Sequence, residues 1–224
     1  MTRLYLIRHA QAQGNIDRVF QGRLDGELSA RGQEQIKFLA RRCKEYGIQA
    51  IYSSPLIRAY ETAKAVNEYY HLPIFLKKEI IEIDGGRFEG HSFADLPQLF
   101  PREFDLWEND PAHFTAPGGE SMKQVYQRMQ RGIEAILQEN QGKTIAVFSH
   151  GCAIRNYQCF LHGWGVEKIN EIGWCENTSV NLIEYDKDLR PRILYLSDAS
   201  HLPNKETCPS DVAWWKTKPP AAVK

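Results

Sequence analysis

The chain lacks the features that mark several common classes of protein. It has no excess of charge, because 28 Lys and Arg residues balance 28 Asp and Glu residues, so no overall field favours nucleic acid or an anionic membrane. No apolar run approaches the ~18 residues of a membrane span. The first ten residues, which include Arg3 and Arg8, do not resemble a signal peptide. We therefore expect a cytoplasmic protein that binds neither nucleic acid nor membrane.

Familiar cofactor and metal motifs are also missing. The five cysteines are odd in number and scattered, with no C-x-x-C pair, which is typical of a reduced compartment. No G-x-x-x-x-G-K-[ST] or G-x-G-x-x-G segment occurs, and the seven histidines include neither H-x-H nor H-E-x-x-H. Cys152 stands only three residues before Arg155, too close for a cysteine-phosphatase loop. We expect neither a metal nor a cofactor.

The pattern that is present predicts one α/β domain. The chain has 224 residues, of which 42% are hydrophobic, and this suffices for a full core. Strand-like runs occur near 3–7, 50–53, 79–83, 144–149, 180–185 and 192–196, and helical periodicity fills much of the sequence between them. This alternation predicts a mostly parallel sheet that is covered by helices on both faces.

Local signals place four helices. One is expected near 30–46, before Gly47. A second should start at Ser54-Pro55, with Ser54 as N-cap and Pro55 at the first position. Ser121 and Gln124 form a capping box that opens a third. The fourth should follow Gly151 and run to about residue 161.

Two segments depart from the regular alternation. Residues 92–118 are rich in aromatic residues and proline and lack long periodicity, so they form either an inserted lid or a packing appendage. The domain is expected to span 1–200, with an irregular tail over 201–224. Trp214-Trp215 in that tail could pack on the domain or on a partner subunit, which leaves a homodimer possible.

The ends of two predicted strands carry the residues most suited to chemistry. The first strand runs into Arg8-His9, and the fourth runs into Ser149-His150-Gly151. The carboxyl edge of an open α/β sheet is where ligands bind. Arginine offers a fork of donors for phosphate, and a neutral histidine offers a nucleophilic nitrogen. A single such histidine is more often structural, but two at equivalent edges favour a site.

Arg58 and a carboxylate add to this set. Arg58 lies in the first turn of the helix expected after Ser54, where free N–H groups and the helix dipole attract anions. Glu82 precedes a glycine-rich turn and could donate a proton if burial favours its protonated form. From spacing alone, Glu79, Asp84 and Glu89 compete for this role.

Seven motifs in order resemble the histidine phosphatase superfamily, in the branch that includes cofactor-dependent phosphoglycerate mutase, fructose-2,6-bisphosphatase and α-ribazole phosphatase. They are Arg8-His9, Asn15 six residues later, Leu28-Ser29-x-x-Gly32, S-S-x-x-x-R-x-x-x-T-A over 53–63, E-x-x-x-G-x-F-E-G over 82–90, Gly118-Gly119-Glu120-Ser121 and Ser149-His150-Gly151. The resemblance covers about 3–200. It implies a three-layer α/β/α sandwich with a site at the carboxyl edge of the sheet.

The resemblance also implies roles for individual residues. His9 would be the nucleophile that becomes phosphorylated, and Glu82 the proton donor. The phosphoryl group would be held by Arg8, Arg58 and, if protonated, His150. Further substrate contacts would come from Asn15, Gln21, Gly22 and the amide of Gly151. No metal would be needed, because cationic side chains supply the charge.

The chain departs from the family pattern after Arg8-His9, and three functions remain possible. The family often has Gly-[Gln/Glu]-Thr where this chain has Ala10-Gln11-Ala12, which should alter loop hydrogen bonding slightly. Only 35 residues separate Glu82 from Gly118, which favours a phosphatase for a small phosphorylated metabolite over a mutase with a long insertion. A sugar phosphate, α-ribazole phosphate, an amino-acid phosphate such as phosphoserine, or an unselective range of phosphomonoesters would fit. A non-catalytic protein that binds a phosphorylated ligand is the third alternative.

Overall fold

A single six-stranded sheet organises the computed structural model, which describes residues 1–203. The strand order is β3-β2-β4-β1-β5-β6. Strands β1 to β4 are mutually parallel, β5 is antiparallel to β1, and β6 is antiparallel to β5. The strands are β1 (Thr2–Arg8), β2 (Ala50–Ser53), β3 (Ile74–Leu76), β4 (Thr144–Ser149), β5 (Val180–Tyr185) and β6 (Pro191–Asp198). The helices are α1 (Gln13–Ile16), α2 (Ala30–Cys43), α3 (Ile57–Asn67), α4 (Leu96–Leu99), α5 (Pro101–Asn109), α6 (Met122–Glu139) and α7 (Gly151–Leu161).

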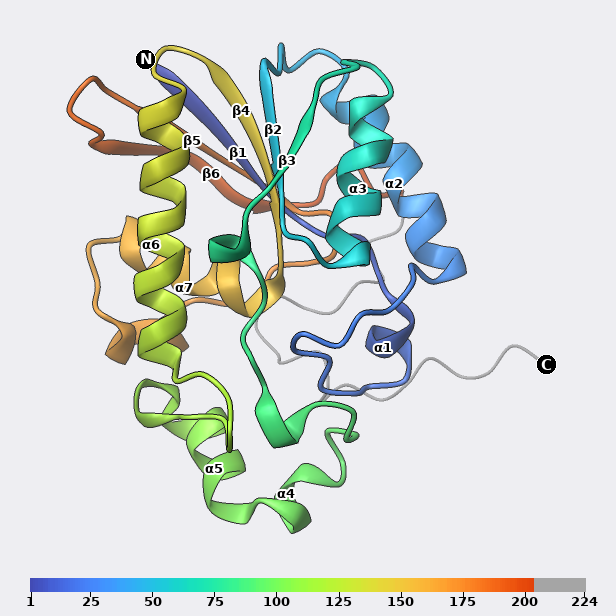
Figure 1. Ribbon diagram of the computed structural model, residues 1–224, viewed down its shortest axis with the longest axis vertical. Coiled ribbons are helices and arrows are strands. Elements are labelled where there is room, and N and C mark those ends of the chain that lie inside the picture. Colours follow the sequence, from blue (N-terminus) through green and yellow to red (C-terminus); the bar gives the residue numbers. More distant parts are fainter. Residues whose placement is uncertain (204–224) are drawn as a thin grey trace.

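Helices cover both faces of the sheet because alternate side chains of each strand point to opposite faces. On β1, Leu4 and Leu6 join the core beneath α6 and α7, whereas Tyr5 and Ile7 join the core beneath α2 and α3. Figure 1 shows the two helix pairs on either side of the sheet. The predicted three-layer α/β/α fold with a mostly parallel sheet is confirmed.

Serine caps begin two of the helices as the sequence predicts. Ser29 Oγ accepts a hydrogen bond from Gly32 N at the start of α2, and Ser121 forms the predicted capping box with Gln124 at the start of α6. Helix α7 spans the predicted residues. Helix α2 ends at Cys43, three residues before the predicted end.

The predicted start of α3 was wrong by two residues. The helix begins at Ile57 with Leu56 as N-cap, not at Pro55 with Ser54 as N-cap. The carboxylate of Asp25 accepts a hydrogen bond from Ile57 N at 2.7 Å, so a distant loop caps the helix. The hydroxyl of Ser54 contacts His150 Nε2 at 2.7 Å instead.

The strand predicted over 79–83 was also wrong. The third strand of the parallel set is Ile74–Leu76, and residues Lys78–Ile80 form a short 3₁₀ turn. Both segments are apolar enough to form a strand. The choice between them depends on contacts with helix α6 that lie more than 40 residues away in sequence.

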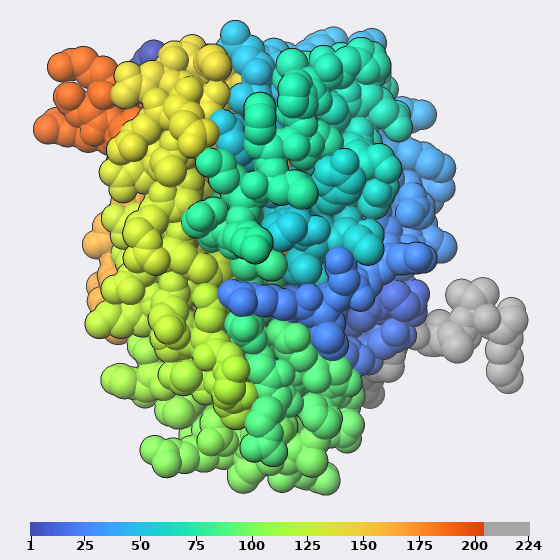
Figure 2. Space-filling view, viewed as in Figure 1, coloured from blue at the N-terminus to red at the C-terminus, as the bar shows by residue number. Residues whose placement is uncertain are grey.

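Residues 92–118 form an insertion that contains α4, α5 and a 3₁₀ turn, Pro111–His113. In Figure 1 this insertion lies beyond the carboxyl ends of the parallel strands. Its aromatic side chains Phe100, Phe104 and Phe114 are buried in the core beneath α6 and α7. In Figure 2 the blue N-terminal loop crosses between the green insertion and the cyan segment that contains α3. The loop and the insertion therefore border the same edge of the sheet.

Two sequence predictions concern the end of the chain. Trp214 and Trp215 lie outside the described residues, and the boundary between a domain over 1–200 and a tail over 201–224 stays a prediction. Among residues 1–203, no helix combines the length and apolar character required to cross a bilayer.

Candidate active site

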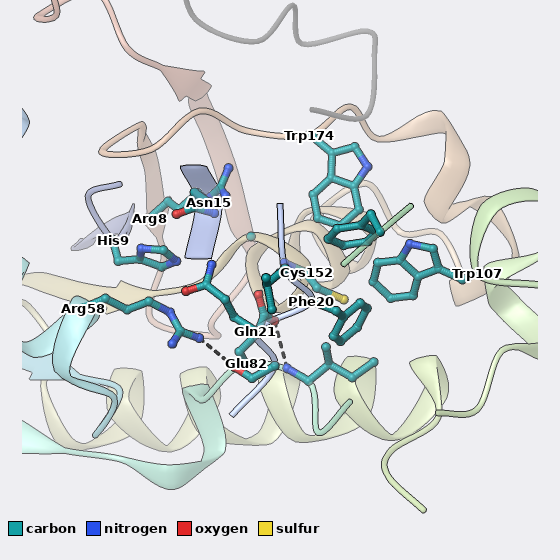
Figure 3. A pocket seen from close by; sticks show the side chains of 15 residues that line it. Arg8, His9, Asn15, Phe20, Gln21, Arg58, Glu82, Trp107, Cys152 and Trp174 are labelled. Carbon is teal, nitrogen blue, oxygen red and sulfur yellow. Dashed lines mark hydrogen bonds between the residues drawn. The ribbon is translucent and has the colours of Figure 1, made fainter. Parts of the chain in front are cut away.

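A pocket of about 460 Å³, open to solvent, lies at the carboxyl edge of the parallel strands. Figure 3 shows that its two sides differ in chemistry. Arg8, His9 and Arg58 lie on one side, and Phe20, Trp107 and Trp174 lie on the other. Glu82 lies between them, and Gln21 also points into this space.

The backbone fixes the orientation and tautomer of the His9 ring. His9 follows β1 directly and is 3% exposed. Its Nδ1 lies 2.6 Å from the carbonyl oxygen of Ala10, so Nδ1–H donates and Nε2 keeps its lone pair. Burial, followed by the charges of Arg58 and Arg8, lowers the pKa of His9 well below 6.5. The ring is therefore unprotonated at neutral pH.

Two buried guanidinium groups flank this ring. Arg58, in the first turn of α3, is 1% exposed and donates to the carbonyls of Gly22 and Leu24 at 2.7 and 2.8 Å. Burial lowers the pKa of Arg58 to about 10, which still leaves it charged at pH 7. Arg8 donates to the carbonyl of Cys175. Each arginine is thus held by backbone carbonyls rather than by a carboxylate that would neutralise it.

Three buried nitrogen atoms around His9 have no hydrogen-bond partner among the described residues. They are Nε of Arg8, Nε of Arg58 and Nδ1 of His150. Buried polar atoms usually have hydrogen-bond partners in folded proteins, so these three atoms are candidates for contacts with a bound group. Because the arginine nitrogens are donors only, a group that binds them must accept hydrogen bonds, and an anion accepts the strongest ones from a guanidinium group.

His150 lies directly beside His9, with ring centroids 5.1 Å apart. It is the N-cap residue of α7 and is fully buried. Burial, then the charge of Arg58, lowers the pKa of His150 well below 6.5. The protonated form allowed for by the sequence analysis is therefore disfavoured. His150 contacts the ring of His9 but does not itself line the pocket.

The Glu82 carboxylate is bound to the first turn of α7. Oε1 accepts from Ala153 N at 3.0 Å and Ile83 N at 2.9 Å, and Oε2 accepts from Cys152 N at 3.1 Å. The ionised carboxylate has about four acceptor positions. Three are used by these backbone groups, which leaves one on Oε2. Among the four carboxylates considered from sequence, only Glu82 lines the pocket.

The remaining residues predicted from sequence occupy different positions in the site. Asn15 and Gln21 line the pocket, and Asn15 Oδ1 is already bonded to Ala12 N at 2.9 Å. Gly22 has φ +50° and positions Arg58 through its carbonyl group. A Cβ at Gly151 would meet the Arg8 guanidinium at 3.3 Å, so glycine lets the two approach closely.

Seven of the fifteen residues that line the pocket were not predicted as site residues. The residues not predicted are Val19, Phe20, Ile83, Phe93, Trp107, Cys152 and Trp174. Phe93 and Trp107 belong to the insertion, so part of it borders the pocket, and its role as a lid stays a prediction. Trp174 follows α7 and stacks under Arg155, 4.8 Å from the ring centroid. An aromatic residue in an irregular segment offers no sequence signal for this placement.

The family of the chain follows from comparison with known proteins. A model of the histidine phosphatase superfamily (branch 1) matches residues 4–198, so the chain belongs to this family. It is 35% identical to phosphoserine phosphatase 1 of Hydrogenobacter thermophilus over 202 residues, which are 90% of this chain and 95% of the relative. The chain is thus a histidine phosphatase, as its motifs predict.

Solved structures agree with this assignment. Bacillus stearothermophilus YhfR superposes with a TM-score of 0.86 at 28% identity, covering 90% of this chain and 99% of that protein. The α-ribazole phosphatase from Shigella flexneri superposes with a TM-score of 0.80 at 26% identity, covering 88% and 96%. Relatives in this family therefore act on chemically different phosphorylated compounds, and the substrate must be argued from the pocket.

Proposed function

We propose that the protein hydrolyses a small phosphomonoester through a phosphohistidine at His9. The observation that carries this proposal is the state of the His9 ring. Its Nδ1–H is bound to a backbone carbonyl, and burial beside two arginines lowers its pKa and so favours the neutral form. A ring that only bound phosphate would gain from being protonated, whereas a nucleophile must be neutral.

In the first step, Nε2 of His9 attacks phosphorus. A nitrogen–phosphorus bond forms and the bond to the leaving oxygen breaks. Arg8 and Arg58 stabilise charge on the equatorial oxygens, which is the main requirement of phosphoryl transfer. His150 donates a hydrogen bond to the same group. Glu82, in its protonated form, delivers a proton to the leaving oxygen from the free position on Oε2.

In the second step, water replaces the leaving group. Glu82, now a carboxylate, accepts a proton from the water as its oxygen attacks phosphorus. The bond between nitrogen and phosphorus breaks, which releases inorganic phosphate and restores neutral His9. The position of Glu82 between the charged and aromatic sides of the pocket suits both steps, because water must approach phosphorus from the side on which the leaving group departed.

The leaving group is expected to have an apolar or ring-shaped part. Beyond the phosphate end, the pocket wall is built by Val19, Phe20, Ile83 and the tryptophans of the aromatic side. Among described residues that line the pocket, the only cationic side chains are Arg8 and Arg58. Both are needed for the phosphoryl group, so a substrate carboxylate would have no second cation to bind.

Phosphate release from a substrate panel tests this proposal. The panel contains p-nitrophenyl phosphate, phosphoserine, α-ribazole phosphate, sugar phosphates and 3-phosphoglycerate, with EDTA present. We expect EDTA-resistant hydrolysis by the wild type and none by His9→Ala. The wild type should also trap ³²P in an acid-labile, base-stable form that His9→Ala does not. Hydrolysis that survives in His9→Ala would refute the mechanism.

Two alternatives are decided by the same panel. The relative of 35% identity favours phosphoserine as substrate, and that outcome would show that the aromatic side does not select the leaving group. A phosphoglycerate mutase would interconvert 3-phosphoglycerate with little net phosphate release, stimulated by 2,3-bisphosphoglycerate. A protein that only binds phosphorylated ligands would release phosphate from none of them.

A further inference from the structure

Four consecutive carbonyl groups just before the pocket are bound by side chains rather than by a neighbouring strand. Ser149 Oγ donates to the carbonyl of Ile80 at 2.7 Å. Arg128 donates to the carbonyls of Glu79, Ile81 and Glu82 at 2.9, 2.6 and 2.9 Å. The backbone that leads into Glu82 is therefore held by long-range hydrogen bonds from α6 and β4.

Arg128 uses all of its hydrogen-bonding capacity at this place. A guanidinium group has five N–H donors in a fixed plane. Three of them bind the carbonyls of the 79–82 segment, and the other two bind the Glu120 carboxylate through Nε at 2.8 Å and Nη2 at 3.0 Å. Because each donor has its own acceptor, the guanidinium group has one orientation. The three carbonyl groups that it binds are held in place with it, and so is the backbone of residues 79–82.

Glu120 extends the contact to the other side of Glu82. Its Oε2 also accepts from Asp84 N at 3.0 Å and lies 3.2 Å from Nη2 of Arg23. Burial acts to raise the pKa of Glu120, but its bonds with Arg128 outweigh burial and lower the pKa below its ordinary value. The carboxylate is therefore ionised at neutral pH, and the pair fixes the backbone both before and after Glu82.

Helix α6 is shaped to approach this segment closely. Gly132 lies one turn after Arg128, and a Cβ there would meet Cβ of Glu79 at 2.5 Å. Arg128 itself does not line the pocket, so it is out of reach of a substrate. Its charge contributes to the lowered pKa of His150, and its hydrogen bonds act through the backbone of the segment that carries Glu82.

We infer that Arg128 is a positioning residue that orients the Glu82 carboxylate toward the leaving oxygen. This inference rests on the proposed role of Glu82 as proton donor. The backbone N–H groups of α7 hold the carboxylate at one end of the side chain, and Arg128 holds its backbone at the other. With both ends fixed, the free position on Oε2 keeps one direction, and a shift of ~1 Å in such a group can lower a rate about 100-fold.

Leaving-group dependence separates this role from a merely structural one. The value of kcat/KM reports the transfer of phosphate to His9, in which Glu82 protonates the leaving oxygen. Alkyl phosphates need that proton, whereas p-nitrophenyl phosphate has a leaving group that departs without it. For Arg128→Met we expect kcat/KM to fall ~10- to 100-fold on alkyl phosphates and less than about threefold on p-nitrophenyl phosphate.

Matched variants make the test decisive. Arg131→Met removes an exposed arginine from the same helix and should leave both values unchanged. Arg128→Lys keeps the charge but has too few donors for four acceptor groups, so it should follow Arg128→Met. In a Glu82→Gln background, Arg128→Met should have little further effect, because the proton donor is already absent. Thermal unfolding confirms that each variant is folded.

Three results would overturn the inference. Equal losses on both substrate types would assign Arg128 a structural role only, as would an unchanged kcat/KM on both. An effect of Arg128→Met that is undiminished in the Glu82→Gln background would show that it does not act through Glu82. If the wild type itself lacks His9-dependent hydrolysis, the proposed function fails first and the inference fails with it.

Discussion

Acidification should destabilise this protein through its two site histidines. His9 and His150 are buried, and burial followed by the charge of Arg58 lowers the pKa of each ring well below 6.5. In the unfolded chain each ring titrates near pH 6.5. Below that pH the unfolded state therefore binds protons that the folded state does not, so the free energy of unfolding falls as pH falls. Above pH ~7 both states are neutral and this effect vanishes.

The size of the effect follows from the linkage relation. A ring that stays neutral in the folded protein down to pH 5.5 lowers the free energy of unfolding by about 1.2 kcal/mol between pH 7 and pH 5.5. The two rings together account for about 2.5 kcal/mol, a large share of the ~5–15 kcal/mol of a typical domain. His201, whose pKa burial lowers to about 4, adds a further loss in the same direction, because its ring also stays mostly neutral at pH 5.5 in the folded protein.

Urea unfolding at pH 7 and pH 5.5 measures this loss. Single variants are compared with the wild type, so that contributions from other groups cancel. His150→Asn and His9→Ala should each lose about 1.2 kcal/mol less than the wild type over this interval. If both variants lose as much stability as the wild type, the rings are protonated in the folded protein. In that case the argument that His9 is a neutral nucleophile near pH 6 is wrong.

Three further predictions test the phosphate end of the site and the loop that caps α3. Gly151→Ala places a methyl group 3.3 Å from the Arg8 guanidinium, so KM for phosphomonoesters should rise. The urea midpoint should change no more than it does for a typical substitution at the protein surface. An unaltered KM would show that Arg8 does not set affinity. Arg58→Lys cannot bind two carbonyls and also reach a phosphoryl oxygen, so kcat should fall ~10²- to 10³-fold, and a loss below fivefold would contradict this. Asp25→Ala removes the acceptor of Ile57 N and should lower the free energy of unfolding in urea by about 1 kcal/mol. An unchanged free energy of unfolding would contradict a capping role for Asp25.

The charged half of the site could be predicted from sequence because local structure fixes it. Arg8 and His9 end a buried strand, and His150 ends its parallel neighbour in register, with Arg8 opposite Ser149. Strand ends that are paired in this way must lie together at one edge of the sheet. Arg58 follows the next strand at the same edge. Each of these residues needs only the strand that precedes it to be correctly located.

The aromatic half could not be predicted because no periodic pattern leads to it. Phe20 lies in a loop after α1, and Phe93 and Trp107 lie in an insertion whose path is set by packing on α6. Phe20 packs on Trp107 at 5.1 Å and on Phe93 at 5.5 Å between ring centroids. These contacts join segments some 70 to 90 residues apart, and aromatic residues in loops serve as core or as ligand wall equally well.

The incorrect strand at 79–83 has the same cause as the function inferred for Arg128. Strand-like composition describes what a segment prefers, but a strand also needs a neighbour to accept its backbone hydrogen bonds. Here the neighbour is a guanidinium plane on α6 and a hydroxyl on β4, which take the carbonyls of 79–82. A regular strand would make its bonds within the sheet plane and continue into it. Because side chains bind this segment, Glu82 stays outside the sheet and its carboxylate reaches the first turn of α7, the position from which we propose that it donates a proton.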